Sequence, residues 1–193
     1  IEGGFGLDGL LRVRSDVVKG IVNGVDTDVW NPTIDKLIPK NYSFDDMKGK
    51  AACKKALQEY YGLPVREDVP VIGLISRLVS QKGVAEVFAP SYGCLYNLCS
   101  SMDIQFVLLG SGDKWCEDEI LNLQSKLPNF RAKIGYNENL SHLIEAGSDF
   151  FLMPSRYEPC GLNQMYSLLY GTLPIVRRTG GLADTVENYN EVT

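Results

Sequence analysis

Two cationic side chains, Arg77 and Lys82, follow an apolar stretch at residues 69–75, and Gly83 stands beside the second of them. A planar guanidinium and an ammonium point charge together suit a diphosphate, on which negative charge accumulates when it leaves. A lone arginine and lysine are more often solvated surface charges. Their position favours binding instead, because ligands of open α/β sheets lie beyond the carboxyl ends of the strands.

A second group of residues follows another apolar stretch, at 150–153. Glu158 places a carboxylate at a strand end, and Gly161 lets the start of the following helix approach a ligand closely. Free backbone N–H groups at such a start can hold phosphate or sugar oxygens. Gly180 and Gly181 repeat this arrangement after the next apolar stretch. Together with the two cations, these residues predict a site for an anionic ligand.

Two further features are ambiguous. The run Gly110-Ser111-Gly112 is no dinucleotide fingerprint, because Trp115 occupies the place of the third glycine. A tight turn and a ligand-lining loop explain this run equally well. Tyr136 follows another strand and can either stack on a base or pack against the protein.

The elements that carry these residues alternate between strand and helix. Apolar runs predict buried strands at 69–75, 104–109, 130–134, 150–153 and 173–176. Helices are expected at 43–61, 84–98, 115–127, 139–146, 161–170 and 182–188. Such alternation is typical of right-handed βαβ units, and strands that are apolar throughout are typical of a sheet covered on both faces. The sequence therefore predicts an α/β fold with a Rossmann-like, doubly wound parallel sheet.

Three local signals refine this prediction. Ser43 can cap the helix at 43–61, and Pro90 should break or kink the helix at 84–98. Residues 17–22 predict a short strand that precedes the turn signal Asn23-Gly24.

Composition limits the classes of function. The 193 residues are 45% hydrophobic and 22% charged, which suits one domain that buries about two-thirds of its unfolded surface. A net charge of −5 without a dense basic stretch argues against nucleic-acid binding, and no apolar run is long enough to span a membrane. The five cysteines form no Cys-x-x-Cys pair and His142 is the single histidine, so we expect reduced thiols and no metal site.

Seven motifs, taken in order, carry a resemblance to a known family: GIVNGVDTDVWNP, GKAACKKALQ, GLISRLVSQKG, FVLLGSGD, IGYNE, MPSRYEPCGLNQ and YGTLPIVRRTGGLADTV. This set closely resembles the bacterial glycogen synthases and plant starch synthases. These are retaining glycosyltransferases (hexosyltransferases) of the GT-B fold, in which two Rossmann-like domains face each other. The resemblance covers nearly the whole chain. It implies transfer of glucose from ADP-glucose to the non-reducing end of an α-1,4-glucan, with no metal ion and no cofactor.

The resemblance also implies roles for individual residues. Arg77 and Lys82 would bind the diphosphate and stabilise the departing nucleotide. Glu158 would hold the donor glucose and help to organise the transition state, so these three residues are the expected catalytic set. The remaining nucleotide-sugar contacts would come from Tyr136 against the adenine, from the backbone of Cys160, Gly161 and Leu162, from Asn163, and from the loop at Gly180 and Gly181. Asn163 stands where many bacterial members have threonine, although several plant-type members also have asparagine.

By the same resemblance, we expect residues 1–30 to be a lead-in from a preceding domain and residues 31–193 to form the nucleotide-sugar-binding domain. The family's amino-terminal domain and its last carboxyl-terminal helices are then missing. Because the α-1,4-glucan acceptor binds between the two domains, this chain alone should bind nucleotide but transfer little or no glucose. The expected location is a plastid in a plant or alga and the cytoplasm in a bacterium.

Two alternatives stay open. One is a non-catalytic nucleotide-binding module that kept the fold, against which the presence of Arg77, Lys82 and Glu158 argues. The other is a GT-B glycosyltransferase that uses a UDP-sugar. The stretches EPCGLNQ and TGGLADTV favour a glucan synthase, but they do not determine whether the nucleotide of the donor is ADP or UDP.

Overall fold

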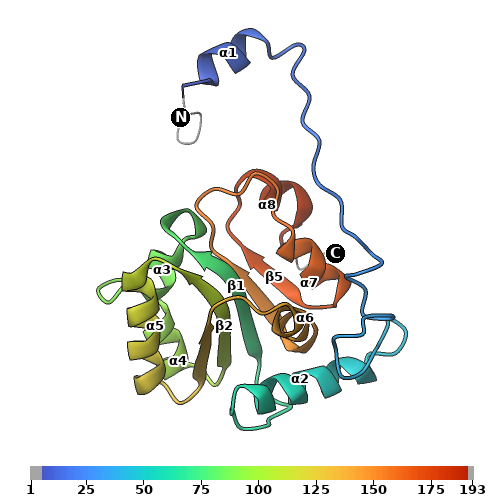
Figure 1. Ribbon diagram of the computed structural model, residues 1–193, viewed down its shortest axis with the longest axis vertical. Coiled ribbons are helices and arrows are strands. Elements are labelled where there is room, and N and C mark those ends of the chain that lie inside the picture. Colours follow the sequence, from blue (N-terminus) through green and yellow to red (C-terminus); the bar gives the residue numbers. More distant parts are fainter. Residues whose placement is uncertain (1–5, 191–193) are drawn as a thin grey trace.

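A parallel sheet of five strands forms the centre of the computed structural model, which describes residues 6–190 (Figure 1). The strands lie in the order β3-β2-β1-β4-β5 and comprise β1 (Val71–Leu78), β2 (Gln105–Gly112), β3 (Phe130–Ile134), β4 (Phe150–Met153) and β5 (Leu173–Val176). The helices are α1 (Asp8–Val13), α2 (Lys48–Tyr60), α3 (Val84–Phe88), α4 (Leu95–Ser101), α5 (Lys114–Lys126), α6 (Glu138–Gly147), α7 (Asn163–Leu169) and α8 (Gly180–Thr185). The predicted α/β fold is thus confirmed. No helix within residues 6–190 is long and apolar enough to cross a membrane.

Both faces of the sheet are covered, and strand β2 shows how. Its side chains alternate, so that Phe106 and Leu108 join one buried cluster while Val107 and Leu109 join another. Helices α3, α4 and α5 complete the first cluster, and α2, α6 and α8 contribute to the second (Figure 1). This double coverage explains why the strands are apolar throughout rather than alternating.

The helix predicted at 84–98 is two helices, α3 and α4. Pro90 lies in the break between them, as its missing N–H predicts. Ala89, directly before it, is extended with φ −60° and ψ 137°, because a residue before proline avoids the helical region.

Two predictions about the amino-terminal part of the chain were also wrong. Helix α2 begins at Lys48 rather than at residue 43, since Ser43 and Asp46 exchange backbone hydrogen bonds in a tight turn and the Ser43 side chain caps nothing. Residues 17–22 form no strand: their backbone pairs with none of the five strands, and Ile21 is 95% exposed. An apolar alternation predicts a strand only where a neighbouring strand is present to pair with it.

Strand β2 is longer than predicted and includes Gly110 and Gly112. These glycines pair with Ser76 and Leu78 of β1. A Cβ atom on Gly110 would lie 2.1 Å from the carbonyl oxygen of Ser76, and one on Gly112 would lie 2.5 Å from that of Leu78. The glycines therefore permit close approach of two backbones, and the interpretation as a turn was wrong.

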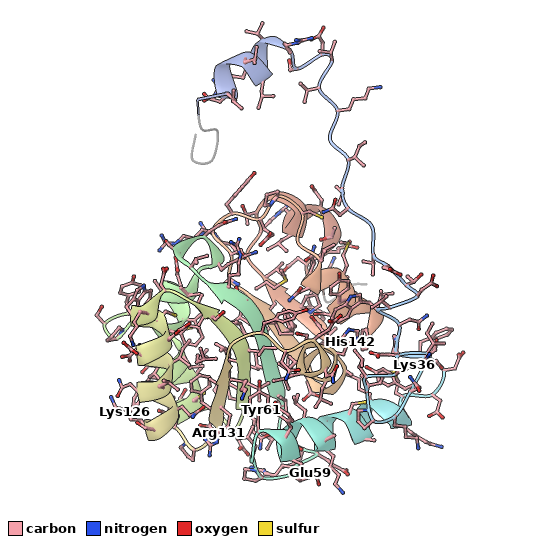
Figure 2. All side chains as sticks on the ribbon, viewed as in Figure 1. Lys36, Glu59, Tyr61, Lys126, Arg131 and His142 are labelled. Carbon is pink, nitrogen blue, oxygen red and sulfur yellow. The ribbon has the colours of Figure 1, made fainter. Side chains whose placement is uncertain are left out.

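Residues 26–47 attach to the sheet domain through an aromatic stack. The Trp30 ring lies between the rings of His142 and Tyr166, with centroid distances of 3.7 and 4.0 Å. Asp35 accepts hydrogen bonds from His142 Nδ1 at 2.8 Å and from the Tyr170 hydroxyl at 2.6 Å. His142 lies beside the loop that carries Lys36 (Figure 2). The predicted domain boundary at residue 30 stays a prediction, although Trp30 itself packs on the sheet domain.

Two ionisable groups are buried next to this stack. Lys50 Nζ donates to the carbonyl oxygens of Ala146 and Tyr170 at 3.1 and 3.0 Å, which are carbonyls at the ends of α6 and α7. Glu145 is wholly buried, and its Oε2 accepts a hydrogen bond from Ser167 Oγ at 2.7 Å. Burial lowers the pKa of Lys50 to about 8 and raises the pKa of Glu145 to about 8.

Candidate functional site

A cleft of about 570 Å³ opens at the carboxyl ends of the strands, where the sequence places its chemically capable residues. Strands β1, β2 and β4 and the loops after β3 and β4 line it. The lining residues are Asn23, Ile75, Ser76, Arg77, Lys82, Leu109, Gly110, Ser111, Gly135, Tyr136, Leu152, Met153, Pro154, Ser155, Glu158, Pro159, Cys160, Gly161, Leu162 and Asn163. Eight of the ten predicted site residues are in this set.

The closest polar contact in the cleft is an ion pair. Lys82 Nζ lies 2.5 Å from Glu158 Oε2, and Ser155 Oγ donates to the same oxygen at 3.2 Å. The side chains of Lys82 and Glu158 are only 20% and 9% exposed. A pair held largely away from water keeps most of its Coulomb attraction, so the two groups are positioned before any ligand arrives.

Arg77 supplies a cation of a different kind. It lies on β1 opposite Ser111 of β2, and its side chain is exposed at the cleft. Within residues 6–190 its guanidinium has neither a hydrogen-bond acceptor nor an ion-pair partner. Its five N–H donors are therefore available to an anion.

Backbone contacts join the loop that carries Lys82 to the loop that carries Glu158. Gly83 has φ +71°, and a Cβ atom there would lie 2.1 Å from the carbonyl oxygen of Pro154. The Arg156 N–H donates to the Gln81 carbonyl at 2.9 Å, and the Gln81 side chain donates back to the Tyr157 carbonyl at 3.2 Å. The ion pair thus depends on two loops that are about 70 residues apart in the chain.

The segment that follows Glu158 forms another wall of the cleft. Cys160, Gly161 and Leu162 line it in irregular backbone before α7, and Gly161 has φ +75°, where glycine is favoured. Asn163 begins α7, and its side chain donates to the carbonyl of Ile75 at 3.4 Å. Opposite this wall, Tyr136 follows β3 and is 84% exposed.

Gly180 and Gly181 do not line the cleft. They lie behind the loop, where a Cβ atom on Gly180 would be 2.1 Å from the Glu158 carbonyl oxygen and one on Gly181 would be 2.4 Å from Cys160 Cα. The Gly181 N–H donates to the Glu158 carbonyl at 2.9 Å. Their predicted contact with a donor sugar stays a prediction, while the observed contact supports the loop from behind.

Asn23 and Ser155 are among the lining residues that sequence reasoning missed. Asn23 was interpreted only as part of a turn, yet it reaches the cleft from the segment before Trp30. Ser155 is buried beside Glu158, and the signal that could have found it is its position three residues before that carboxylate. The residues that the structure describes contain no group of three or more His, Cys, Asp or Glu side chains placed to hold a metal ion.

Comparison with known families identifies the family of the chain. The family described as glycosyl transferases group 1 matches residues 62–192, which is more than half of the chain. The chain belongs to the group 1 glycosyl transferases.

Within this glycosyl transferase family, the chain is similar to glycogen and starch synthases. It is 63% identical over 192 residues to glycogen synthase from Treponema denticola, and 51% identical over 190 residues to starch synthase 1, chloroplastic/amyloplastic, from Triticum aestivum. These alignments cover 100% and 98% of this chain, but only 39% and 29% of the relatives. The predicted resemblance is confirmed, in both bacterial and plant relatives.

A solved structure agrees with the sequence relatives. The catalytic domain of starch synthase IV from Arabidopsis thaliana, bound to ADP and acarbose, superposes with a TM-score of 0.90 at 40% identity. The match covers all of this chain and 39% of that one. The group 1 glycosyl transferase chain described here therefore spans between 29% and 39% of the length of these synthases.

Proposed function

We propose that this chain is the donor-binding part of an α-glucan synthase, which transfers glucose from ADP-glucose to the non-reducing end of an α-1,4-glucan. The observation that carries the proposal is the largely buried Lys82–Glu158 pair beside Arg77, whose guanidinium has no partner within residues 6–190, at the strand ends of a chain similar to glycogen synthases. Cations and a carboxylate in one cleft suit a ligand that has both a diphosphate and a sugar.

Each group has a task in this proposal. Arg77 and Lys82 bind the diphosphate and stabilise its negative charge as the bond to glucose breaks. Glu158 accepts hydrogen bonds from glucose hydroxyls and orients the sugar. Tyr136 lies against the adenine. Because the two cations neutralise the leaving group, the proposed transfer needs no metal ion and no cofactor.

The proposal extends to partners and place of action. The α-1,4-glucan acceptor requires a second domain, so the chain alone binds ADP or ADP-glucose and turns over little. A net charge of −5 supports the absence of a nucleic-acid partner, and we propose no membrane partner. Plant relatives named chloroplastic/amyloplastic support a plastid for a plant source, and bacterial relatives support the cytoplasm for a bacterial one.

Calorimetric titration of ADP and, in parallel, UDP into this chain tests the proposal. We expect ADP to bind with a Kd on the order of 10 µM to 1 mM and UDP to bind more weakly. Lys82→Ala should abolish detectable binding. Lys126→Ala is the matched control, because this lysine is exposed at the end of α5, at a distance from the carboxyl ends of the strands (Figure 2).

The other outcomes discriminate among the alternatives. Equal or tighter binding of UDP would favour a UDP-sugar enzyme. Failure of a folded chain to bind either nucleotide would contradict the proposal. ADP binding combined with no glucan synthesis by the longer protein would favour a non-catalytic module.

A further inference from the structure

The side chain of Gln164 lies directly behind the wall of the cleft formed by Cys160, Gly161 and Leu162. It is wholly buried and does not line the cleft itself. Its Nε2 is 3.0 Å from the Cys160 carbonyl oxygen and 3.1 Å from the Gly161 carbonyl oxygen. Two adjacent carbonyl groups therefore point inward at one buried amide.

This arrangement determines where two N–H groups point. The C=O and N–H of a trans peptide point in opposite directions, and no peptide bond within residues 6–190 is cis. The Cys160 carbonyl shares its peptide unit with the Gly161 N–H, and the Gly161 carbonyl shares one with the Leu162 N–H. Both N–H groups therefore point away from Gln164, and the segment that carries them lines the cleft.

Neither N–H group is used by the protein. Within residues 6–190, the N–H groups of Gly161 and Leu162 donate to no backbone or side-chain acceptor. A backbone donor without a protein partner needs water or a ligand. Two such donors on one wall, across from Lys82 and Arg77, are available for phosphate or sugar oxygens.

The orientation of the amide is determined by its surroundings. Two carbonyl oxygens can accept only from the NH2 end, so Nε2 faces them, and the other end of the amide, Oε1, has no hydrogen-bond partner in the described chain. A Cβ atom on residue 161 would lie 2.4 Å from Gln164 Oε1. A side chain at residue 161 would therefore displace the buried amide of Gln164. The same Nε2 also lies 3.0 Å from Thr185 Oγ1, which ties the segment to α8.

We propose that Gln164 is a positioning residue of the donor site, whose buried amide turns the peptides after Cys160 and Gly161 so that two N–H donors face the ligand. The ligand class is the diphosphate-sugar of the proposed function, on which this inference rests. Gln164 itself touches no ligand.

The test compares two buried glutamines by calorimetry with ADP. Gln164→Met keeps the length and burial of the side chain and removes the donor. Gln58→Met is the matched control, because Gln58 is also buried and its Nε2 also donates to a carbonyl group, that of Arg66, but far from the cleft. We expect ADP affinity to fall about 10- to 100-fold in Gln164→Met, the range for two misdirected donors to a charged group, and to stay within about twofold in Gln58→Met. Equal affinities, or equal losses in both variants, would overturn the proposal.

A second variant and a second readout keep the test decisive. Thr185→Val removes one of the three acceptors of Gln164 and should weaken ADP binding less than Gln164→Met does. The amide NMR resonances of Gly161 and Leu162 need no nucleotide: they should shift in Gln164→Met and not in Gln58→Met, and unshifted resonances would overturn the proposal. Shifted resonances in a chain whose wild type does not bind ADP would support the positioning role while contradicting the proposed function.

Discussion

Replacing the buried Glu145 by glutamine should change how stability depends on pH. Burial is the largest cause that raises the pKa of this carboxyl group, from 4.5 to about 8, while the hydrogen bond from Ser167 and the charge of Lys50 oppose the shift. The carboxyl group is therefore mostly protonated in the folded chain at neutral pH. Glutamine imitates that protonated form in shape and charge.

The sign and size of the effect follow from linkage. A pKa that is raised on folding contributes stability that is fully present below pH 4.5 and is lost as the pH rises toward about 8. Between pH 5 and pH 7, the wild type should lose about 2 to 3 kcal/mol of unfolding free energy relative to Glu145→Gln, because each pH unit in this window is worth about 1.4 kcal/mol.

Urea unfolding of both proteins at several pH values between 5 and 7 measures this difference. Groups that titrate identically in both proteins contribute equally to the two unfolding free energies, so their contributions cancel in the difference. Glu67→Gln, at an exposed position, is the control for the loss of one carboxylate. A Glu145→Gln variant that is less stable than the wild type at pH 7, by an amount that does not depend on pH, would refute the reasoning, because it would mean that an ionised Glu145 stabilises the fold.

Three further changes separate stability from binding. Gly83→Ala places a Cβ atom against Pro154 in a left-handed conformation, so it should cost at least about 2 kcal/mol in urea unfolding and also weaken ADP binding; wild-type stability would contradict the backbone contact. Trp30→Ala removes both stacking contacts and should cost about 2 to 3 kcal/mol, measured in the same way; an unchanged unfolding midpoint would show that residues 26–47 do not depend on the stack. Arg77→Ala should leave stability within about 0.5 kcal/mol and lower ADP affinity about tenfold or more in calorimetry, because the guanidinium has no partner in the described chain; a large loss of stability would be the contrary result.

Much of the fold and of the cleft could be predicted because the signals are local. Apolar runs determine β1 to β5, and parallel strands bring their carboxyl ends, with Arg77, Lys82 and Glu158, to one edge. The predicted ends of elements were wrong where contacts with a distant backbone segment determine them. Gly110 is an example, because its conformation depends on a strand more than 30 residues earlier. The prediction of a strand at 17–22 was wrong because a segment forms a strand only when its backbone pairs with a neighbouring strand.

The aromatic and ionic cluster could not have been predicted. Trp30 and His142 are more than 100 residues apart, and only the folded chain shows that their rings stack. Gln164 gives no signal in the sequence either, because its role depends on the direction of two carbonyl groups. A glutamine beside a glycine-containing loop has no characteristic spacing.

The contact between Lys82 and Glu158 also affects which anions can occupy the cleft. In the free protein the lysine already has a counter-charge, so an entering phosphate must either share the lysine with the carboxylate or displace it. A simple inorganic anion would then leave Glu158 buried without a cation and close to another negative charge, which is costly. A ligand that offers hydroxyl groups to Glu158 and an anionic group to Lys82 satisfies both partners at once. We therefore expect the ion pair to disfavour small inorganic anions relative to a sugar linked to a diphosphate.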